Sequence, residues 1–274
     1  GDGTSVPYHV YVKTTVTAPT TVRPMTLKSS GGETSIVPGS LLSEQTLPVV
    51  GQYINYAIDP VNKRVVVTYQ GNSSAGTRAI IGEIGSDNII TWGDDIQIST
   101  VLTYADLVFD SASGHFLLIG SWQTRLKAIA LVPASGTTWD ADTADGSPPT
   151  DFSQNYFGSS QVDTGNNGYW SVAGDGNGNY MALGNTNNDK AVIANVTYDP
   201  NSSPKFHFSA GNQFFNSRIG DTTITYNSTQ DKFVAAFQDY GTGHGKSFVA
   251  QVATNPLSAP TTGSITTFDS QYAL

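Results

Sequence analysis

The chain has 274 residues, of which 13% are charged and 11% aromatic, a composition that predicts a folded protein, because disordered chains combine high charge with few aromatic residues. Its formal net charge of −9 and its 13 scattered lysines and arginines exclude the clustered cations that nucleic acid binding requires. The lack of cysteine excludes disulfides and thiolate metal sites, and no apolar run approaches the roughly 20 residues that span a bilayer.

The first 50 residues predict a partial repeat unit of three strands, at 7–15, 22–30 and 33–43. These strands correspond in spacing to the second, third and fourth strands of the units that follow. The first strand of this unit is missing from the pattern. A ring of such units would therefore need a strand from elsewhere in order to close.

Four hairpin patterns follow, each with two alternating apolar runs around a turn. Asp and Asn open such turns because their side chains accept bonds from the backbone two residues on. A third strand with a basic residue at or near its start follows each hairpin, and then a fourth strand, which three of the units mark with Thr and an aromatic residue. The residues that open the turns, roughly 50 to 65 positions apart, are Asp59, Asp110, Asp175 and Asn227.

Four short strands in each repeat of this length predict an all-β fold, namely a β-propeller-like domain of four-stranded antiparallel blades. We expect about five units, of which the N-terminal one is incomplete. Their predicted boundaries are 1–50, 51–100, 101–166 (with a long insertion), 167–217 and 218–274. The runs 65–67, 116–119 and 233–237 are apolar enough to predict strands buried on both faces.

Residues 53–122 carry the clearest repeat, with the segments "YAIDPVNKRVVVTYQ" and "GTRAIIGEIGSDNIITWG". This stretch resembles a repeat class of phage and marine-virus structural proteins. In that class an Asp-turn hairpin of the "YDxxxxKVVVAY" type precedes a "GTAxxG" strand and a short "SISFG"-like strand. The resemblance implies propeller-type repeats on a virion surface, in a fibre, a spike or a capsid-decorating protein. It carries no catalytic residues to this chain.

The pattern of titratable residues gives little support for an enzyme. Glycoside hydrolysis requires two carboxylates that flank the scissile bond, one of them kept protonated. The chain has only three glutamates, predicted at turns or on outer strands, and the repeated aspartates are explained by the turns that they open. The four histidines fall in different units, and three of the five arginines share one repeat position. We therefore expect no enzymatic activity.

The insertion at 137–168 breaks the repeat and is the predicted binding region, because loops on a rigid scaffold often carry function. Its carboxylates are candidate ligands for Ca²⁺, a hard cation that prefers oxygen; the other reading is a solvated loop. No other cofactor is expected. The candidate calcium ligands are Asp140, Asp142 and Asp145. Aromatic residues in and after the insertion that could stack on sugar rings, or else cover a blade edge, are Tyr156, Phe157, Tyr169 and Trp170.

Taken together, the sequence predicts a virion or extracellular surface protein for assembly or for attachment to a host glycan. Its expected partners are copies of itself, other virion proteins and a host surface glycan, with no nucleic acid and no membrane insertion. The alternatives are a secreted propeller glycosidase or lyase that acts on polysaccharide, and a subunit of an extracellular bacterial fibre. Two carboxylates that converge in a pocket at the ring axis would favour the enzyme.

Overall fold

The structure is a computed structural model that describes 52–70, 76–86, 89–99, 102–122, 125–140, 170–185, 190–202, 205–209, 211–255 and 258–269, together with short strands before residue 47. Every regular element among these residues is a β-strand, and every strand pairs antiparallel with its neighbours. Accordingly, no described segment forms a helix of the length and hydropathy that a bilayer crossing needs. The predicted all-β fold is confirmed.

The short strands before residue 47 form two small sheets. One has the order β1-β2-β5 and the other pairs β3 with β4. Their bounds are β1 His9–Val12, β2 Thr21–Met25, β3 Leu27–Ser29, β4 Ile36–Pro38 and β5 Gln45–Thr46.

Four larger sheets follow in chain order, and in each of them the first three strands pair in sequence order. The first contains β6 Gln52–Asp59, β7 Arg64–Gln70, β8 Thr77–Ile84 and β9 Ile90–Ser99. The second contains β10 Thr103–Asp110, β11 His115–Trp122 and β12 Arg125–Leu131. The third contains β13 Ser171–Gly174, β14 Asn179–Asn185, β15 Ala191–Tyr198, β16 Phe206–Phe208 and β17 Asn212–Phe215. The fourth contains β18 Ile219–Asn227, β19 Lys232–Asp239, β20 Gly245–Gln251, β21 Thr261–Thr262 and β22 Thr266–Asp269.

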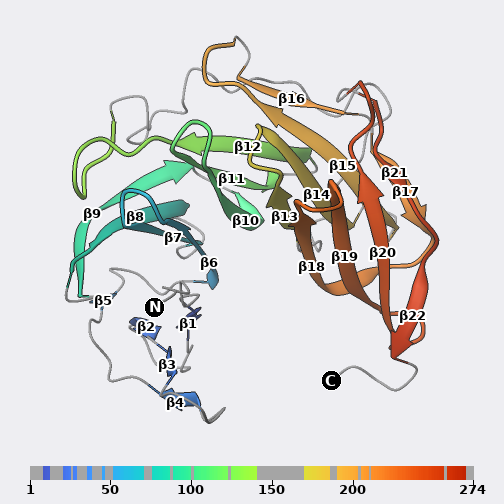
Figure 1. Ribbon diagram of the computed structural model, residues 1–274, viewed down its shortest axis with the longest axis horizontal. Helices are drawn as coiled ribbons and strands as arrows, with labels where there is room; N and C mark the ends of the chain where they lie inside the picture. The colour runs from blue at the N-terminus through green and yellow to red at the C-terminus, as the bar shows by residue number, and fades with distance from the viewer. Residues whose placement is uncertain are drawn as a thin grey trace.

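The four larger sheets are arranged as the blades of a β-propeller (Figure 1). They follow one another around a common centre, and the first strand of each sheet is its innermost strand. These inner strands, β6, β10, β13 and β18, contact one another in sequence order. Residues that follow the start of each blade are therefore brought together at the axis, although long stretches of chain separate them.

The turns of the first hairpins lie where the sequence predicts them. Asp59 Oδ1 accepts hydrogen bonds from the backbone N–H groups of Val61 and Asn62, at 2.9 and 3.0 Å. Equivalent bonds to the side chains of the opening residues form at 110–114, 175–179 and 227–230. Each opening side chain thereby satisfies backbone donors that the turn removes from strand pairing, which is why Asp or Asn recurs there.

The core lies between successive blades. Val66 of β7 and Leu118 of β11 are fully buried in the cluster that joins the first blade to the second. The predicted buried runs 65–67 and 116–119 are confirmed, since every residue in them is at most 1% exposed.

The run 233–237 departs from this prediction. It alternates instead, because Phe233, Ala235 and Phe237 pack toward the third blade while Val234, on the opposite face of β19, is 38% exposed. The fourth blade thus buries one face of its sheet among the described residues and leaves the other accessible.

Truncation of Leu118 to Ala is expected to lower the free energy of unfolding by about 2–4 kcal/mol, because it removes buried methyl groups and leaves a cavity between two packed sheets. Chemical denaturation measures the change. Val61→Ala is the matched control, since Val61 is 80% exposed in the first turn and its truncation should change stability by less than about 0.5 kcal/mol. Equal effects of the two substitutions would show that the assigned packing of β11 is wrong.

Candidate functional site at the propeller axis

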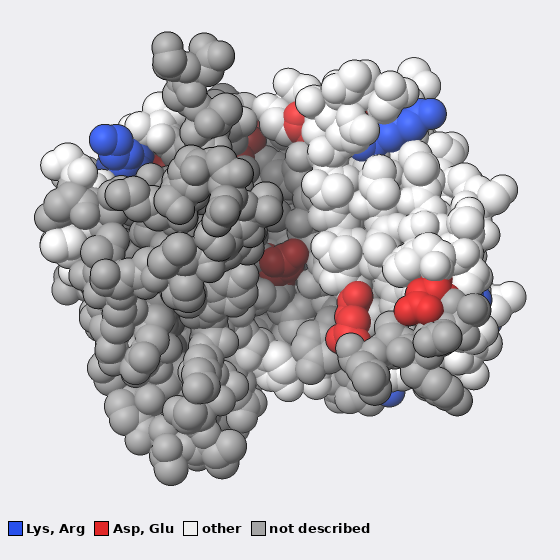
Figure 2. Space-filling model, turned by 60° about the horizontal axis from the view of Figure 1, so that its bottom comes forward, with Lys and Arg blue, Asp and Glu red and all other residues white. Residues whose placement is uncertain are grey.

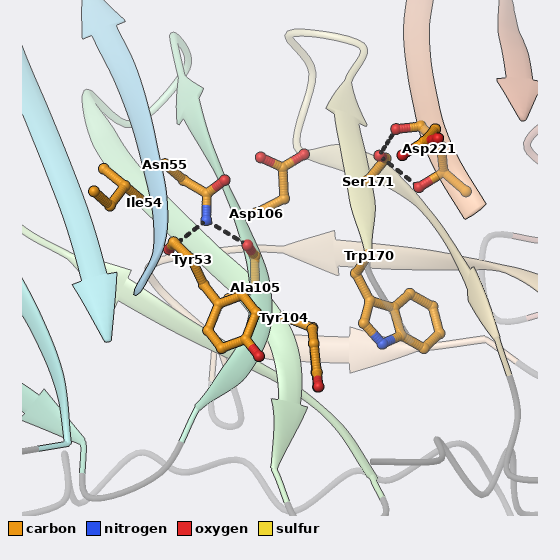
Figure 3. Close-up of a pocket in the computed structure, with 10 residues that line it drawn as sticks. Tyr53, Ile54, Asn55, Tyr104, Ala105, Asp106, Trp170, Ser171 and Asp221 are labelled. Atoms are coloured by element: carbon orange, nitrogen blue, oxygen red, sulfur yellow. Dashed lines mark hydrogen bonds between the residues drawn. The ribbon is translucent and has the colours of Figure 1, made fainter. Parts of the chain in front are cut away.

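The inner strands of the four blades surround a pocket of about 340 Å³ (Figure 3). Ligand pockets commonly measure about 300–1,000 Å³, so this one is suited to a small ligand or to one part of a larger one. On the face shown in Figure 2 the surface is hollowed, and an acidic side chain lies deep in the hollow. The described residues that line the pocket are Tyr53, Ile54, Asn55, Tyr104, Ala105, Asp106, Trp170, Ser171, Asp221 and Thr222.

A β-bulge interrupts the pairing of three inner strands at the pocket. The register shifts between positions 52 and 55 of β6, 103 and 106 of β10, and 220 and 223 of β18. At each bulge one residue has a positive φ, with values of 49° for Tyr53, 52° for Tyr104 and 42° for Asp221. This left-handed conformation costs a non-glycine residue roughly 1–2 kcal/mol, and a bulge re-aims the side chains beside it. The repeat thus places a strained, re-aimed residue at the axis in three blades.

Hydrogen bonds tie each inner strand to the next one at the level of these bulges. Each of them joins a side chain of one strand to the backbone of its neighbour, so they fix the position of the bulged backbone around the axis. The three bonds join Asn55 Nδ2 to Ala105 O (2.5 Å), Val172 N to Asp106 Oδ2 (2.8 Å) and Ser171 Oγ to Thr222 O (2.5 Å).

Asp106 is the titratable group with the most unusual surroundings in the pocket. Burial raises the pKa of its carboxyl to about 6, although backbone N–H bonds from Val172 and Leu107, both 2.8 Å long, favour the ionised form. Desolvation exceeds these two bonds because the inner strands exclude most of the water from this carboxyl. The side chain nevertheless remains partly accessible from the pocket. It can therefore hold a proton near neutral pH and still reach a ligand.

The second carboxylate of the pocket belongs to Asp221, which occupies the bulge of β18 and is exposed. The two acids come from different surroundings, one desolvated and one in contact with solvent. This difference is the usual way in which a pair of carboxylates is divided into a proton donor and an ionised partner.

Aromatic residues form another part of the pocket lining. The rings of Tyr53 and Tyr104 have centroids 4.7 Å apart and are tilted by 58°. Trp170 is only 4% exposed, and its indole N–H donates to Ser121 Oγ at 2.8 Å. The two tyrosines are partly exposed, so they are the aromatic groups that a ligand can contact over a larger area.

Of the seven residues predicted to bind a ligand or calcium, two lie among the described residues. Trp170 lies at the axial pocket, whereas Tyr156, Phe157, Tyr169, Asp142 and Asp145 lie outside the described residues. Asp140 ends the described segment 125–140, where its backbone N–H donates to Val132 O at 2.8 Å. Within the described part of the chain, no three His, Asp or Glu residues gather in a way that could hold a metal ion. Calcium binding by the insertion stays a prediction.

Sequence reasoning missed Asp106 and Asp221, although a signal for them exists. Asp106 stands where the preceding blade has Asn55, and Asp221 stands at the bulge position that holds Tyr53 and Tyr104 in other blades. Both are therefore carboxylates that break the repeat at its innermost positions. Because repeated residues serve the fold, such exceptions are the positions where function should be sought.

No model of a known protein family matches the chain, and no curated protein matches it. Solved structures do match over most of its length. AofleA from Arthrobotrys oligospora is 8% identical with a TM-score of 0.53, covering 92% of this chain and 65% of its own. A Lactobacillus plantarum protein is 12% identical with a TM-score of 0.50, covering 95% of this chain and 66% of its own. A GH43 glycoside hydrolase is 14% identical with a TM-score of 0.45, covering 94% of this chain and 52% of its own.

At such identities the likeness to solved structures shows the fold. Fold and site together therefore define the class, a β-propeller with an acidic and aromatic pocket on its axis. The chain spans only about half to two thirds of the length of these solved chains. None of the three is a phage or virion protein by its description, so the resemblance to virion repeats stays a prediction.

The prediction that the protein has no enzymatic activity is corrected here. It rested on the expectation that carboxylates would not converge in one cleft, whereas Asp106 and Asp221 line one pocket at the axis. The physical reason for the error is that the two acids come from different inner strands, β10 and β18, and are therefore far apart in sequence.

Proposed function

We propose that the protein is a glycoside hydrolase whose reaction takes place in the axial pocket. The observation that carries this proposal is the pair Asp106 and Asp221, two carboxylates with different surroundings that line the same pocket. Glycoside hydrolysis requires such a pair, one acid to protonate the leaving oxygen and one carboxylate to activate water or to attack the sugar.

In the proposed reaction Asp106 donates its proton to the glycosidic oxygen as the bond between that oxygen and the anomeric carbon breaks. A pKa of about 6 keeps a useful share of this acid protonated near neutral pH. In a direct displacement Asp221 accepts a proton from the water whose oxygen bonds to the anomeric carbon; in a two-step reaction Asp221 itself bonds to that carbon, and the water that displaces it gives its proton to Asp106. Asp106 recovers its proton from solvent in the direct case, or from the attacking water in the other.

The backbone around both acids is held in a fixed geometry. The bond from Val172 N keeps Asp106 oriented, and the bond from Ser171 Oγ to Thr222 O fixes the strand next to Asp221. Preorganised groups of this kind lower a barrier because they need no rearrangement in the transition state. We also propose that the protein acts outside the cell or on a virion surface, a setting that is compatible with this activity.

The proposal is tested by incubating the protein with a panel of polysaccharides and aryl glycosides and by measuring released reducing ends or aryl alcohol. We expect hydrolysis of at least one substrate, with kcat/KM falling as the pH rises through about 6, because Asp106 then loses the proton that it must donate. A folded protein without turnover on the panel, or a rate that stays level through pH 6 and beyond, would contradict it.

A further inference from the structure

The three strained bulge residues all face the same pocket. Among the described residues, non-glycine residues with positive φ occur at five positions, and Tyr53, Tyr104 and Asp221 line the axial pocket. Lys63 and Asp231 lie in hairpin turns, where this conformation is common. Strain of about 1–3 kcal/mol per residue persists where the surrounding structure enforces it, and it clusters at ligand sites.

The pocket offers a ligand an aromatic surface beside polar groups. The tilted rings of Tyr53 and Tyr104 come from adjacent blades, and the bond from Asn55 Nδ2 to Ala105 O holds the two bulges together. An aromatic ring presents an apolar, electron-rich face, and the C–H groups on one side of a pyranose ring match such a face. The carboxylates and Ser171 line the same pocket, on the side opposite the tyrosine rings in the view of Figure 3, and can bond hydroxyls of the same glycan.

The charge of the pocket restricts which sugars it accepts. None of its described lining residues is Lys, Arg or His, while two of them are aspartates. In Figure 2 the Lys and Arg side chains lie toward the outer edge of the visible face, away from the hollow. A uronic acid, a sialic acid or a sulfated sugar would bring a further negative charge beside these carboxylates, and no described lining residue carries a positive charge that would offset the repulsion.

We infer that the pocket binds an uncharged glycan, with one sugar ring stacked on the surface formed by Tyr53 and Tyr104. This inference rests on the proposed function and assigns its substrate class. The two acids that are suited to cleave a glycosidic bond also repel anionic sugars. The same site therefore carries out the reaction and selects the substrate. The tyrosines hold the ring, and Asp221 and Asp106 contact its hydroxyl and glycosidic oxygens.

Binding is measured separately from cleavage with the Asp106→Asn variant, which keeps the pocket and lacks the acidic proton. Calorimetric titration with neutral oligosaccharides (gluco-, xylo-, arabino-, manno- and galacto-configured) and with uronic acid and sulfated oligosaccharides tests the class. We expect binding of a neutral oligosaccharide, weakened at least tenfold when Tyr104→Ala or Tyr53→Ala is added. Tyr226→Ala, at the opposite end of β18, is the control and should leave the affinity unchanged.

The outcomes separate the two proposals. Neutral glycan binding that depends on Tyr104, in a wild-type protein without turnover, would support this inference and defeat the proposed hydrolysis. Turnover of an anionic polysaccharide by the wild-type protein would support the proposed hydrolysis and defeat the inference that the pocket binds an uncharged glycan. Preference for an anionic oligosaccharide, equal loss with the Tyr226 control, or no binding by any member of either set would overturn the inference.

Discussion

Replacement of Asp106 with Asn is expected to lower kcat/KM for the hydrolysed substrate by about 10²–10⁴-fold, the range that general acid catalysis contributes. An amide of nearly the same size has no acidic proton to give to the leaving oxygen; its one acceptor oxygen can keep the bond from Val172 N or from Leu107 N, and the other bond is lost. The rates are compared at pH 5, where the wild-type carboxyl is largely protonated.

The matched control for this substitution is Asp199→Asn. Asp199 accepts a backbone bond from Asn201 in an exposed turn of the third blade, and an amide oxygen can keep that bond. Its replacement should leave kcat/KM within a factor of about two of the wild-type value. Asp221→Asn should cause a loss as large as that of Asp106→Asn. If the Asp106→Asn variant keeps the turnover of the wild-type protein, Asp106 is not the acid of the reaction.

The Asp106→Asn variant also tests the raised pKa of Asp106 without a substrate, through the pH dependence of protein stability. The pKa of Asp106 is raised from 3.8 to about 6 in the folded state, so the folded protein binds the proton more tightly than the unfolded chain. The resulting stabilisation is fully present below about pH 4 and is lost as the pH rises through about 6. Relative to Asp106→Asn, the wild-type protein should therefore lose about 1–3 kcal/mol of stability between pH 4 and 7.5. Denaturation at several pH values measures the difference.

Substitution of Gly120 by Ala is expected to damage both the fold and the site. An added Cβ on Gly120 would lie 2.5 Å from the Cα and Cβ atoms of Ala105, which is backbone of the β10 bulge and cannot simply rotate away. Overpacking of this kind costs about 1–3 kcal/mol. The displaced bulge also carries Tyr104 and Asp106, and a shift of about 1 Å in a reacting group can lower the rate by about 100-fold.

The matched control is Gly263→Ala, where a Cβ would meet Val249 O at an ordinary 3.5 Å. Denaturation and kcat/KM are measured on both variants. We expect losses in both quantities for Gly120→Ala and in neither for Gly263→Ala. Undiminished turnover in a destabilised Gly120→Ala variant would show that the bulge of β10 does not position the reacting groups.

The blade plan of this protein can be predicted from its sequence because the responsible interactions are local. Each first hairpin is set by an Asp or Asn whose side chain bonds backbone donors two to four residues further on. The continuous apolar runs of β7 and β11 then bury both faces of these strands. The first three strands of each blade pair in sequence order, so their order follows from chain order.

The face of the fourth blade shows where local pattern becomes insufficient. The run 233–237 is as apolar as the buried runs of β7 and β11, but Val234 is exposed because no described element covers its side of β19. Burial of a strand on both faces depends on a neighbouring sheet, and the strand's own residues do not reveal whether that sheet is present.

The axial pocket depends on the tertiary structure alone. The sequence determined the inner strands, but each of them supplies only one to three pocket residues, and Asp106 and Asp221 are brought together by the ring. The raised pKa of Asp106 is likewise invisible in sequence, because it comes from desolvation by strands that are distant along the chain. Short-range bonds and apolar patterns therefore specify the blades, whereas the convergence and the electrostatics of the site depend on how the blades pack around their axis.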